Sequence, residues 1–231
     1  MKIEYSQRYR QGFTLIELLV VIAVLVVLAG LLLPTLARTR ERARLTACEN
    51  NLHEFAKAVV MYRNDFGELE MPDWLSDLHP RYLDSRQVYL CPADRSRGAD
   101  GARPADIGFD APQLEELDDP HLPCSYEYQF AGRPVSSQWD YRGYGITNVP
   151  ANATWKEVKF AQMRFGDINN PRPYDQTVFP MIRCFHHWST RTWRYPAQNK
   201  RMGLTINVAY AGNIFHSPFW WELPLSELEE Q

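Results

Sequence analysis

A long apolar run near the beginning of the chain dominates its pattern of hydrophobic and polar positions. From Leu18 to Leu33 no residue carries a polar side chain. At about 1.5 Å per residue, a helix of twenty-odd residues crosses the roughly 30 Å hydrocarbon core of a bilayer. Because lipid offers no hydrogen-bond partners, only a helix with internally satisfied backbone groups is viable there. We therefore predict a transmembrane helix over residues 13–36, whose exceptions to apolar character are Thr14, Glu17, Pro34 and Thr35.

Beyond Pro34 the pattern changes from uniformly apolar to one-sided. Apolar residues recur at steps of three and four, as on one face of a helix. We expect one helix from Phe13 to Phe66, bent at Pro34 and ending at Gly67. Residues 37–66 form its amphipathic continuation, and their apolar stripe should lie against the domain that follows. The stripe comprises Leu45, Cys48, Leu52, Phe55, Ala56, Val59 and Val60.

After Gly67 the helical period is lost, and short segments alternate with prolines and glycines. We predict a short helical turn at 73–78 and a long surface loop at 94–123, which is rich in Asp, Gly, Pro and Arg. Other segments have the composition of strands. These predicted strands are 87–92, 124–130, 158–167, 181–186 and 204–211.

The order of these elements predicts the fold class. Gly212 and Asn213 follow the clearest strand and lead into Ile214 and Phe215, which indicates a hairpin. A long helix followed by several short strands is typical of an α+β fold, in which a small antiparallel sheet packs on the helix stripe. We expect residues 67–231 to form one globular domain.

Composition supports one domain and argues against one class of partner. The chain has 231 residues, a formal charge of −3 and 45% hydrophobic residues. Without the first 36 residues, roughly 190 remain, which is enough for one domain with a sizeable core. The near-neutral charge gives no basic field for nucleic acid, so we expect no nucleic-acid partner.

Glu17 is the one carboxylate within the apolar run, and its position needs a reason. An ionised Glu near the centre of a transmembrane helix costs about 2.5–3.5 kcal/mol, and less near an end. If the chain is cut between Gly12 and Phe13, the new amino group of Phe13 lies one helical turn from Glu17. In a bundle of such helices, Glu17 of one subunit can neutralise the Phe13 ammonium of a neighbour. The alternative is that Glu17 lies at the headgroup level without a special role.

Gly12, followed by Phe-Thr-Leu-Ile-Glu at 13–17 and then by the apolar run, resembles a known motif. It is similar to the N-terminal cleavage and methylation motif of type IV prepilins and type II secretion pseudopilins. The resemblance implies that a membrane aspartic peptidase, the prepilin peptidase, removes the leader 1–12 and methylates the amine of Phe13. It also implies that Glu17 governs the addition of subunits to a filament. The fold implied is pilin-like.

The resemblance further implies a location and partners. The protein is expected in the bacterial inner membrane as a single-pass protein with an extracytoplasmic C-terminal domain, and then in a filament with other pilin-like subunits. The basic residues favour the opposite orientation. Because the processing enzyme needs the leader on the cytoplasmic side, we predict the orientation that the motif implies. The basic residues are Lys2, Arg8 and Arg10 before the run and Arg38, Arg40, Arg42 and Arg44 after it.

Two other classes of N-terminal segment share the apolar run. A conventional signal peptide has an apolar region of about 7–15 residues and a small-x-small cleavage site, whereas this run is longer and no Ala-x-Ala precedes the arginines. An ordinary single-pass anchor fits the hydrophobicity but leaves Gly12 and Glu17 unexplained.

The globular part also resembles a group of bacterial pilin-like proteins. The resemblance rests on Asn51-Leu52, on 61–67, on Leu90 to Asp94 and on Ser125-Tyr126. Members of this group typically end with a His followed about ten residues later by Asp-Gly-His. Here an insertion follows His186-His187, and Ala211-Gly212-Asn213 stands where Asp-Gly-His is expected.

The four cysteines suggest a disulfide rather than a metal site. Disulfides persist outside the cytoplasm, and Cys91 and Cys124 each border a predicted strand, so we expect these two to pair. Cys48 lies on the apolar stripe and reads as a core residue. The absence of a Cys-x-x-Cys pair gives a structural zinc site little support. His186 and His187 near Cys184 would point to opposite faces of a strand, so no metal site is expected there.

Calcium is the one cofactor that remains possible. Some secretion pseudopilins have a calcium site, but the acidic residues here match no EF-hand spacing, and scattered surface acids explain them better. The acids considered are Asp73, Asp77, Asp84 and Asp94, and the C-terminal Glu222, Glu227, Glu229 and Glu230 are read as a solvated acidic end.

These patterns predict a structural subunit that is not an enzyme. No Gly-x-Ser-x-Gly, His-Glu-x-x-His or phosphate-binding loop is present. We expect a subunit of a type IV pilus or a type II secretion pseudopilus. The main alternative is a membrane-anchored or filament-tip binding or adhesion module, as a minor pseudopilin would be. A tethered enzyme is a weaker third interpretation.

Overall fold

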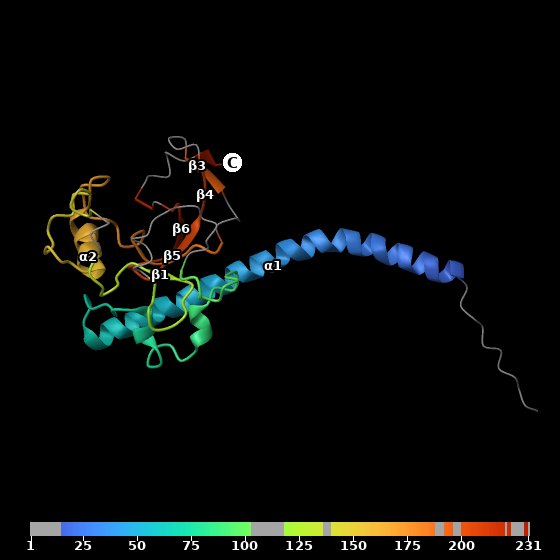
Figure 1. The fold of residues 1–231 in the computed structure, drawn as a ribbon, viewed down its shortest axis with the longest axis horizontal. Coiled ribbons are helices and arrows are strands. Elements are labelled where there is room, and N and C mark those ends of the chain that lie inside the picture. Colours follow the sequence, from blue (N-terminus) through green and yellow to red (C-terminus); the bar gives the residue numbers. More distant parts are fainter. Residues whose placement is uncertain are drawn as a thin grey trace, which may run out of the picture. The chain divides into compact units, whose positions relative to one another are not determined.

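A computed structural model describes residues 15–102, 118–135, 140–187, 192–195, 200–219, 221–222 and 229–230. The chain divides into two compact units, Met1–Ala43 and Arg44–Gln231. One helix, α1 (Leu15–Phe66), contributes to both and is drawn as one continuous ribbon in Figure 1. This confirms the single long helix expected from the sequence, with Pro34 inside it.

The first unit consists of the apolar part of α1. Its side chains from Leu15 to Arg40 are exposed, and those from Leu18 to Leu33 are all apolar. Among the described residues, this is the one helix long and apolar enough to cross a membrane. Its apolar surface therefore has no counterpart within the described chain, which fits contact with lipid or with other helices.

The second unit begins with the amphipathic part of α1. Its buried residues confirm five positions of the predicted stripe and add Ala58, whereas Val60 is 44% exposed. Val60 was therefore wrongly included, because the stripe is narrower than its apolar residues suggest. The helix ends as predicted: Gly67 has a φ of 129°, and its N–H donates to the Arg63 carbonyl at 2.8 Å. The five confirmed positions are Cys48, Leu52, Phe55, Ala56 and Val59.

A small antiparallel sheet forms the centre of this unit. Its strand order is β1-β2-β5-β6, and every neighbouring pair is antiparallel. The strands are β1 (Glu127–Tyr128), β2 (Pro180–Cys184), β5 (Thr205–Ala209) and β6 (Ile214–Ser217). A second sheet has the order β4-β3-β7, with β3 (Thr192–Tyr195), β4 (Lys200–Gly203) and β7 (Glu229–Glu230). The α+β prediction is thus confirmed.

The hairpin β5–β6 confirms the clearest strand prediction. Asn207 lies opposite Phe215, and the Ala209 N–H donates to the Asn213 carbonyl at 2.8 Å. Between them Gly212 has a φ of 91°, a conformation that favours glycine. Strand β2 likewise overlaps the predicted 181–186 strand, although it begins at Pro180 and ends at Cys184.

The predicted strand at 158–167 is wrong, because this segment is mostly helix. Helix α2 spans Trp155–Phe165, and Thr154 is its N-cap. The Thr154 hydroxyl accepts from the Glu157 N–H at 3.3 Å, while the Glu157 carboxylate accepts from the Thr154 N–H at 2.8 Å. This capping box satisfies two backbone donors that a helix start would otherwise leave unpaired.

Two further strand predictions need correction. Residues 87–92 contain the end of a 3₁₀ helix, η2 (Arg86–Tyr89), in which the Leu90 N–H donates to Gln87 at 3.1 Å. These local hydrogen bonds take the place of strand pairing. The segment 124–130 forms only the short strand β1, and it is buried on both faces rather than one. The predicted turn at 73–78 is confirmed as the 3₁₀ helix η1 (Leu75–Leu78).

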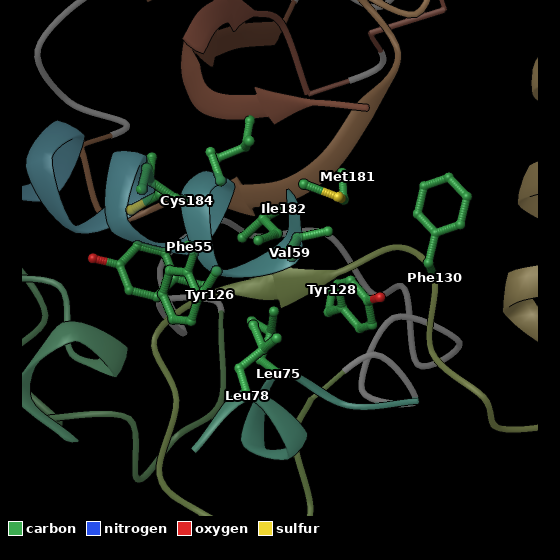
Figure 2. Packing of buried hydrophobic residues seen from close by; sticks show 14 of the residues in the cluster. Phe55, Val59, Leu75, Leu78, Tyr126, Tyr128, Phe130, Met181, Ile182 and Cys184 are labelled. Carbon is green, nitrogen blue, oxygen red and sulfur yellow. The ribbon is translucent and has the colours of Figure 1, made fainter. Parts of the chain in front are cut away.

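The burial of the β1 segment follows from what packs around it. Phe55 of α1 makes edge contacts with Tyr126 and with Tyr89, at centroid distances of 5.4 and 5.0 Å. In Figure 2, Tyr126 and Tyr128 lie between α1 and the η1 residues Leu75 and Leu78. The core therefore joins helix, sheet and the irregular segment between them.

The predicted surface loop at 94–123 is only partly described. Its described residues form turns and bends and are mostly exposed or half-buried, but Asp94, Gly98 and Ala102 are buried. Residues 103–117 lie outside the described part.

Candidate functional site

Glu17 lies in the first described turn of α1. It is the one acidic residue between Leu15 and Arg40, on a helix whose surrounding side chains are apolar and exposed. A carboxylate is favoured near a helix N-terminus by the helix dipole. Gly12 and Phe13, the predicted cleavage and methylation residues, lie outside the described residues.

A second group of chemically notable residues lies inside the globular unit. Cys48 comes from α1, Cys91 directly follows η2 and Leu90, Cys184 ends β2, and His187 lies in the turn after β2. The sulfur atoms of Cys48 and Cys184 are 3.5 Å apart, and the Cys91 sulfur is 3.3 Å from Nε2 of His187. All four donor atoms lie within 4.8 Å of one another, and all four residues are buried. We call this group the Cys3His cluster.

Hydrogen bonds hold the surroundings of the Cys3His cluster. The Tyr126 hydroxyl donates to the Cys48 sulfur at 3.7 Å. The side-chain amide of Asn51 donates to the Tyr126 hydroxyl at 3.2 Å and to the Leu90 carbonyl at 3.0 Å. Asn51 therefore ties α1 to the residue before Cys91 and orients the hydroxyl that reaches Cys48.

The thiols of the Cys3His cluster differ in their acidity. Burial raises the pKa of the Cys184 thiol. Hydrogen bonds with Cys184 and Cys48, together with the nearby His187, lower the pKa of Cys91. Because the thiolate is the form that binds metals, Cys91 is the member most readily converted to a ligand.

The expected Cys91–Cys124 disulfide is not formed. All four cysteines are free thiols. The Cys124 thiol lies 3.5 Å from the carbonyl of Tyr126, whereas Cys91 faces His187. The prediction relied on each cysteine bordering a strand. The segment before Cys91 is instead a 3₁₀ helix, and the Cys91 thiol lies beside His187.

The two adjacent histidines do point to different partners. Nε2 of His186 is 3.7 Å from a carboxylate oxygen of Asp94, while His187 reaches the cysteines. Asp94 also accepts from the Ser125 hydroxyl and from the Gly98 N–H, each at 2.6 Å. Asp94 thus holds the loop after Cys91, and it is a buried structural acid rather than the surface acid expected from the sequence.

Two of the other acids considered for calcium are used separately. Asp73 pairs with Nζ of Lys156 at 2.6 Å, and Asp77 accepts from the Trp74 N–H at 2.8 Å. Within the described ranges, the Cys3His cluster is the group of side chains whose donor atoms lie close enough together to share a metal ion. Glu222 is also not a solvated acid, because it is partly buried and burial raises its pKa, an effect that Lys159 opposes.

Comparison with known proteins bears on the first of the two regions. Residues 7–33 match the family model of the prokaryotic N-terminal methylation motif. The chain carries this motif. The matched residues include Gly12, Phe13 and Glu17.

Two relatives each match about a quarter of the chain. The type IV wide pilus major component PilA4 of Thermus thermophilus is 45% identical over 58 residues, which are 25% of this chain and 44% of that protein. The type II secretion system core protein G of Pseudomonas aeruginosa is 36% identical over 60 residues, 26% of this chain and 42% of that protein. The chain spans less than half the length of these curated relatives. No solved structure matches.

The methylation motif could be found in the sequence, whereas the Cys3His cluster could not. The motif is a contiguous string, whereas the cluster joins positions 48, 91 and 184 that only the fold brings together. One local signal was present: Cys184 and His187 are separated by two residues, a spacing that lets both bind one ion. The strand expected at 181–186 argued against a shared site for these residues, but β2 ends at Cys184 and His187 lies in the turn that follows.

Proposed function

We propose that this protein is a pilin-like structural subunit. Prepilin peptidase removes residues 1–12, the amine of Phe13 is methylated, and α1 then assembles with other pilin-like helices into a type IV pilus or a type II secretion pseudopilus. The subunit begins as a single-pass inner-membrane protein with its globular part outside the cytoplasm. The observation that carries the proposal is the methylation motif at 7–33 on a helix with an exposed apolar surface.

The physical argument concerns how such a helix leaves the membrane. Sixteen apolar residues run from Leu18 to Leu33, and a packed bundle of subunits buries them without lipid. Glu17 then sits in a low-dielectric surrounding, where its charge needs a partner. The Phe13 ammonium of an adjacent subunit supplies one, so that addition of a cleaved subunit is favoured over addition of an uncleaved one.

A filament-building role is preferred to a tip role or a catalytic role. The relatives are named as a major component of a pilus and as a core protein of a secretion system, which supports a subunit present in many copies. Quantitative mass spectrometry of purified filaments distinguishes these roles. We expect many copies per filament, and a value near one would favour the tip module.

Mass spectrometry of the mature N-terminus tests processing. We expect a chain that begins with N-methylated Phe13 in cells with prepilin peptidase and one that begins with the leader in cells without it. Gly12→Ala changes the residue before the predicted cleavage point, and it should leave the leader attached. A leader retained by the unaltered chain in peptidase-positive cells would refute the proposal.

Glu17→Ala tests assembly separately from insertion. The variant should enter the membrane as well as the unaltered chain, because it removes a charge from an apolar helix. It should be lost from filaments by at least tenfold. The matched control is Glu54→Ala on the same helix, which removes an exposed carboxylate that pairs with Lys57 and should assemble normally. Normal assembly of Glu17→Ala would contradict the charge-pairing role.

A further inference from the structure

We propose that Cys48, Cys91, Cys184 and His187 bind a zinc ion in a closed, structural site of the globular unit. This inference goes beyond the assembly role and does not depend on it. It rests on four soft donor atoms that converge from separate segments into one buried place.

The donor set and its dimensions suit zinc. Structural zinc sites are tetrahedral and use Cys and His side chains, with Zn–S of about 2.3 Å and Zn–N of about 2.0–2.1 Å. These bond lengths place neighbouring ligand atoms about 3.5–3.8 Å apart in a tetrahedron. The Cys48–Cys184 and Cys91–His187 distances are 3.5 and 3.3 Å. The widest separation, 4.8 Å, has to contract by about 1 Å around the ion.

The position of the Cys3His cluster favours a structural site over a catalytic one. A catalytic zinc keeps one coordination position open for water or substrate, whereas four protein ligands close the shell. All four residues here are buried. The ion would link α1, the segment after η2 and the end of β2, and such cross-links between distant segments stabilise a fold by constraining the unfolded chain.

The surroundings suit the charge of such a site. Three thiolates and one neutral imidazole around a divalent ion carry one net negative charge. The Tyr126 hydroxyl already donates to the Cys48 sulfur, and Asn51 orients that hydroxyl. Donors of this kind orient metal ligands and partly offset the charge of thiolates. Cys124, the remaining cysteine, lies outside the Cys3His cluster and serves as an internal control.

A disulfide is the competing use of the same residues. The Cys48 and Cys184 sulfur atoms are close enough to be oxidised with little movement. Such a bond would consume two of the four donor atoms and would give no role to the adjacent Cys91 and His187. Zinc uses all four side chains, which is why we favour it.

Metal content of the full chain, purified in detergent, tests the proposal. After dialysis against a weak chelator, elemental analysis should find about one zinc per chain in the unaltered protein and in Cys124→Ser. Cys184→Ser and His187→Ala should retain at least tenfold less zinc. His187→Cys keeps four soft ligands and should restore binding. Absence of zinc from the unaltered chain, another metal in its place, or equal zinc in Cys184→Ser would overturn the proposal.

A second measurement needs no variant and so does not depend on variant folding. Cobalt exchanged into the unaltered chain should give the intense visible bands of tetrahedral cobalt and the near-ultraviolet thiolate-to-cobalt absorption. Non-reducing peptide mapping should recover Cys48 and Cys184 as thiols once the metal is removed by acid. Octahedral cobalt without thiolate bands, or recovery of a Cys48–Cys184 disulfide, would rule the site out.

Discussion

The guanidinium of Arg63 lies over the ring of Tyr210, with 4.4 Å between the guanidinium carbon and the ring centroid. Arg63 also donates to the Tyr210 carbonyl at 3.4 Å and to the Glu68 carbonyl at 2.7 Å. One side chain thus joins the last turn of α1, the segment that follows α1 and the residue directly after β5. Arginine suits this place because its planar group can stack and donate several hydrogen bonds at once.

Arg63→Ala should lower the free energy of unfolding by about 1–3 kcal/mol. The change removes a cation–π contact and leaves carbonyl groups with fewer donors. Denaturant unfolding of the full chain in detergent, followed by tryptophan fluorescence, measures this effect. The control is Lys57→Ala, whose exposed pair with Glu54 should contribute less than about 1 kcal/mol. Equal effects of the two variants would show that the Arg63 contacts add nothing.

Phe55→Ala should be among the most destabilising changes in α1. Phe55 is completely buried and contacts Tyr89 and Tyr126, so its removal leaves a cavity that costs about 3–5 kcal/mol. Val60→Ala, on the exposed side of the same helix, should cost less than about 1 kcal/mol. The same unfolding measurement compares them. A larger effect of Val60→Ala than of Phe55→Ala would show that the buried face of α1 is assigned incorrectly.

Thr154→Ala should weaken the start of α2. It removes the hydroxyl that accepts from the Glu157 N–H, and loss of an N-cap typically costs about 1 kcal/mol. Hydrogen–deuterium exchange should accelerate in the first turn of α2. Thr154→Ser keeps the hydroxyl and should behave like the unaltered chain, and protection unchanged in Thr154→Ala would argue against the cap.

Acid should destabilise the protein partly through Asp94. Burial alone would raise the pKa of this carboxyl, but hydrogen bonds from Ser125, Ser96 and Gly98, with His186 nearby, bring the pKa below its ordinary value of 3.8. A lowered folded-state pKa means stabilisation that is present above that ordinary value and lost as the pH falls through the folded value.

Asp94→Asn therefore should flatten the acid limb of the stability curve. The unaltered chain is expected to lose unfolding free energy more steeply below about pH 4 than the variant does. Chemical denaturation at a series of pH values measures both curves. Asp84→Asn, at an exposed position, should follow the unaltered curve. Parallel curves for Asp94→Asn and the unaltered chain would contradict the assignment.

The parts of the fold that could be predicted are those in which the spacing of apolar residues along the sequence indicates which side chains are buried. The stripe from Cys48 to Val59 identified the inner face of α1, because a helix repeats its faces every three to four residues. The β5–β6 hairpin was equally visible, since Gly212 marks the turn and apolar residues fill the strand before it.

The missed elements depend on signals that were weighed wrongly or are not local. The Thr154-x-x-Glu157 spacing is a capping-box signature, yet 158–167 was interpreted as a strand from its apolar content alone. The short strand β1 is buried on both faces because α1 and η1 cover it, and no pattern within 124–130 encodes that cover.

The two candidate regions differ in the same way. The methylation motif around Gly12, Phe13 and Glu17 is contiguous and could be found directly. The Cys3His cluster requires the β2–β5 pairing to place Cys184 and the packing of α1 to bring Cys48 to it. Local sequence could reveal only its Cys184-x-x-His187 part.

The division of α1 into an exposed apolar part and a partly buried amphipathic part has an evolutionary consequence. The described side chains from Leu15 to Arg40 contribute nothing to the buried core, so we expect selection on them to reflect contacts with molecules outside this chain. Selection from Cys48 onward concerns the fold of this particular globular unit. The two stretches can diverge at separate rates, and a chimera that takes the first 43 residues from a pilus or secretion relative should still fold its remaining residues.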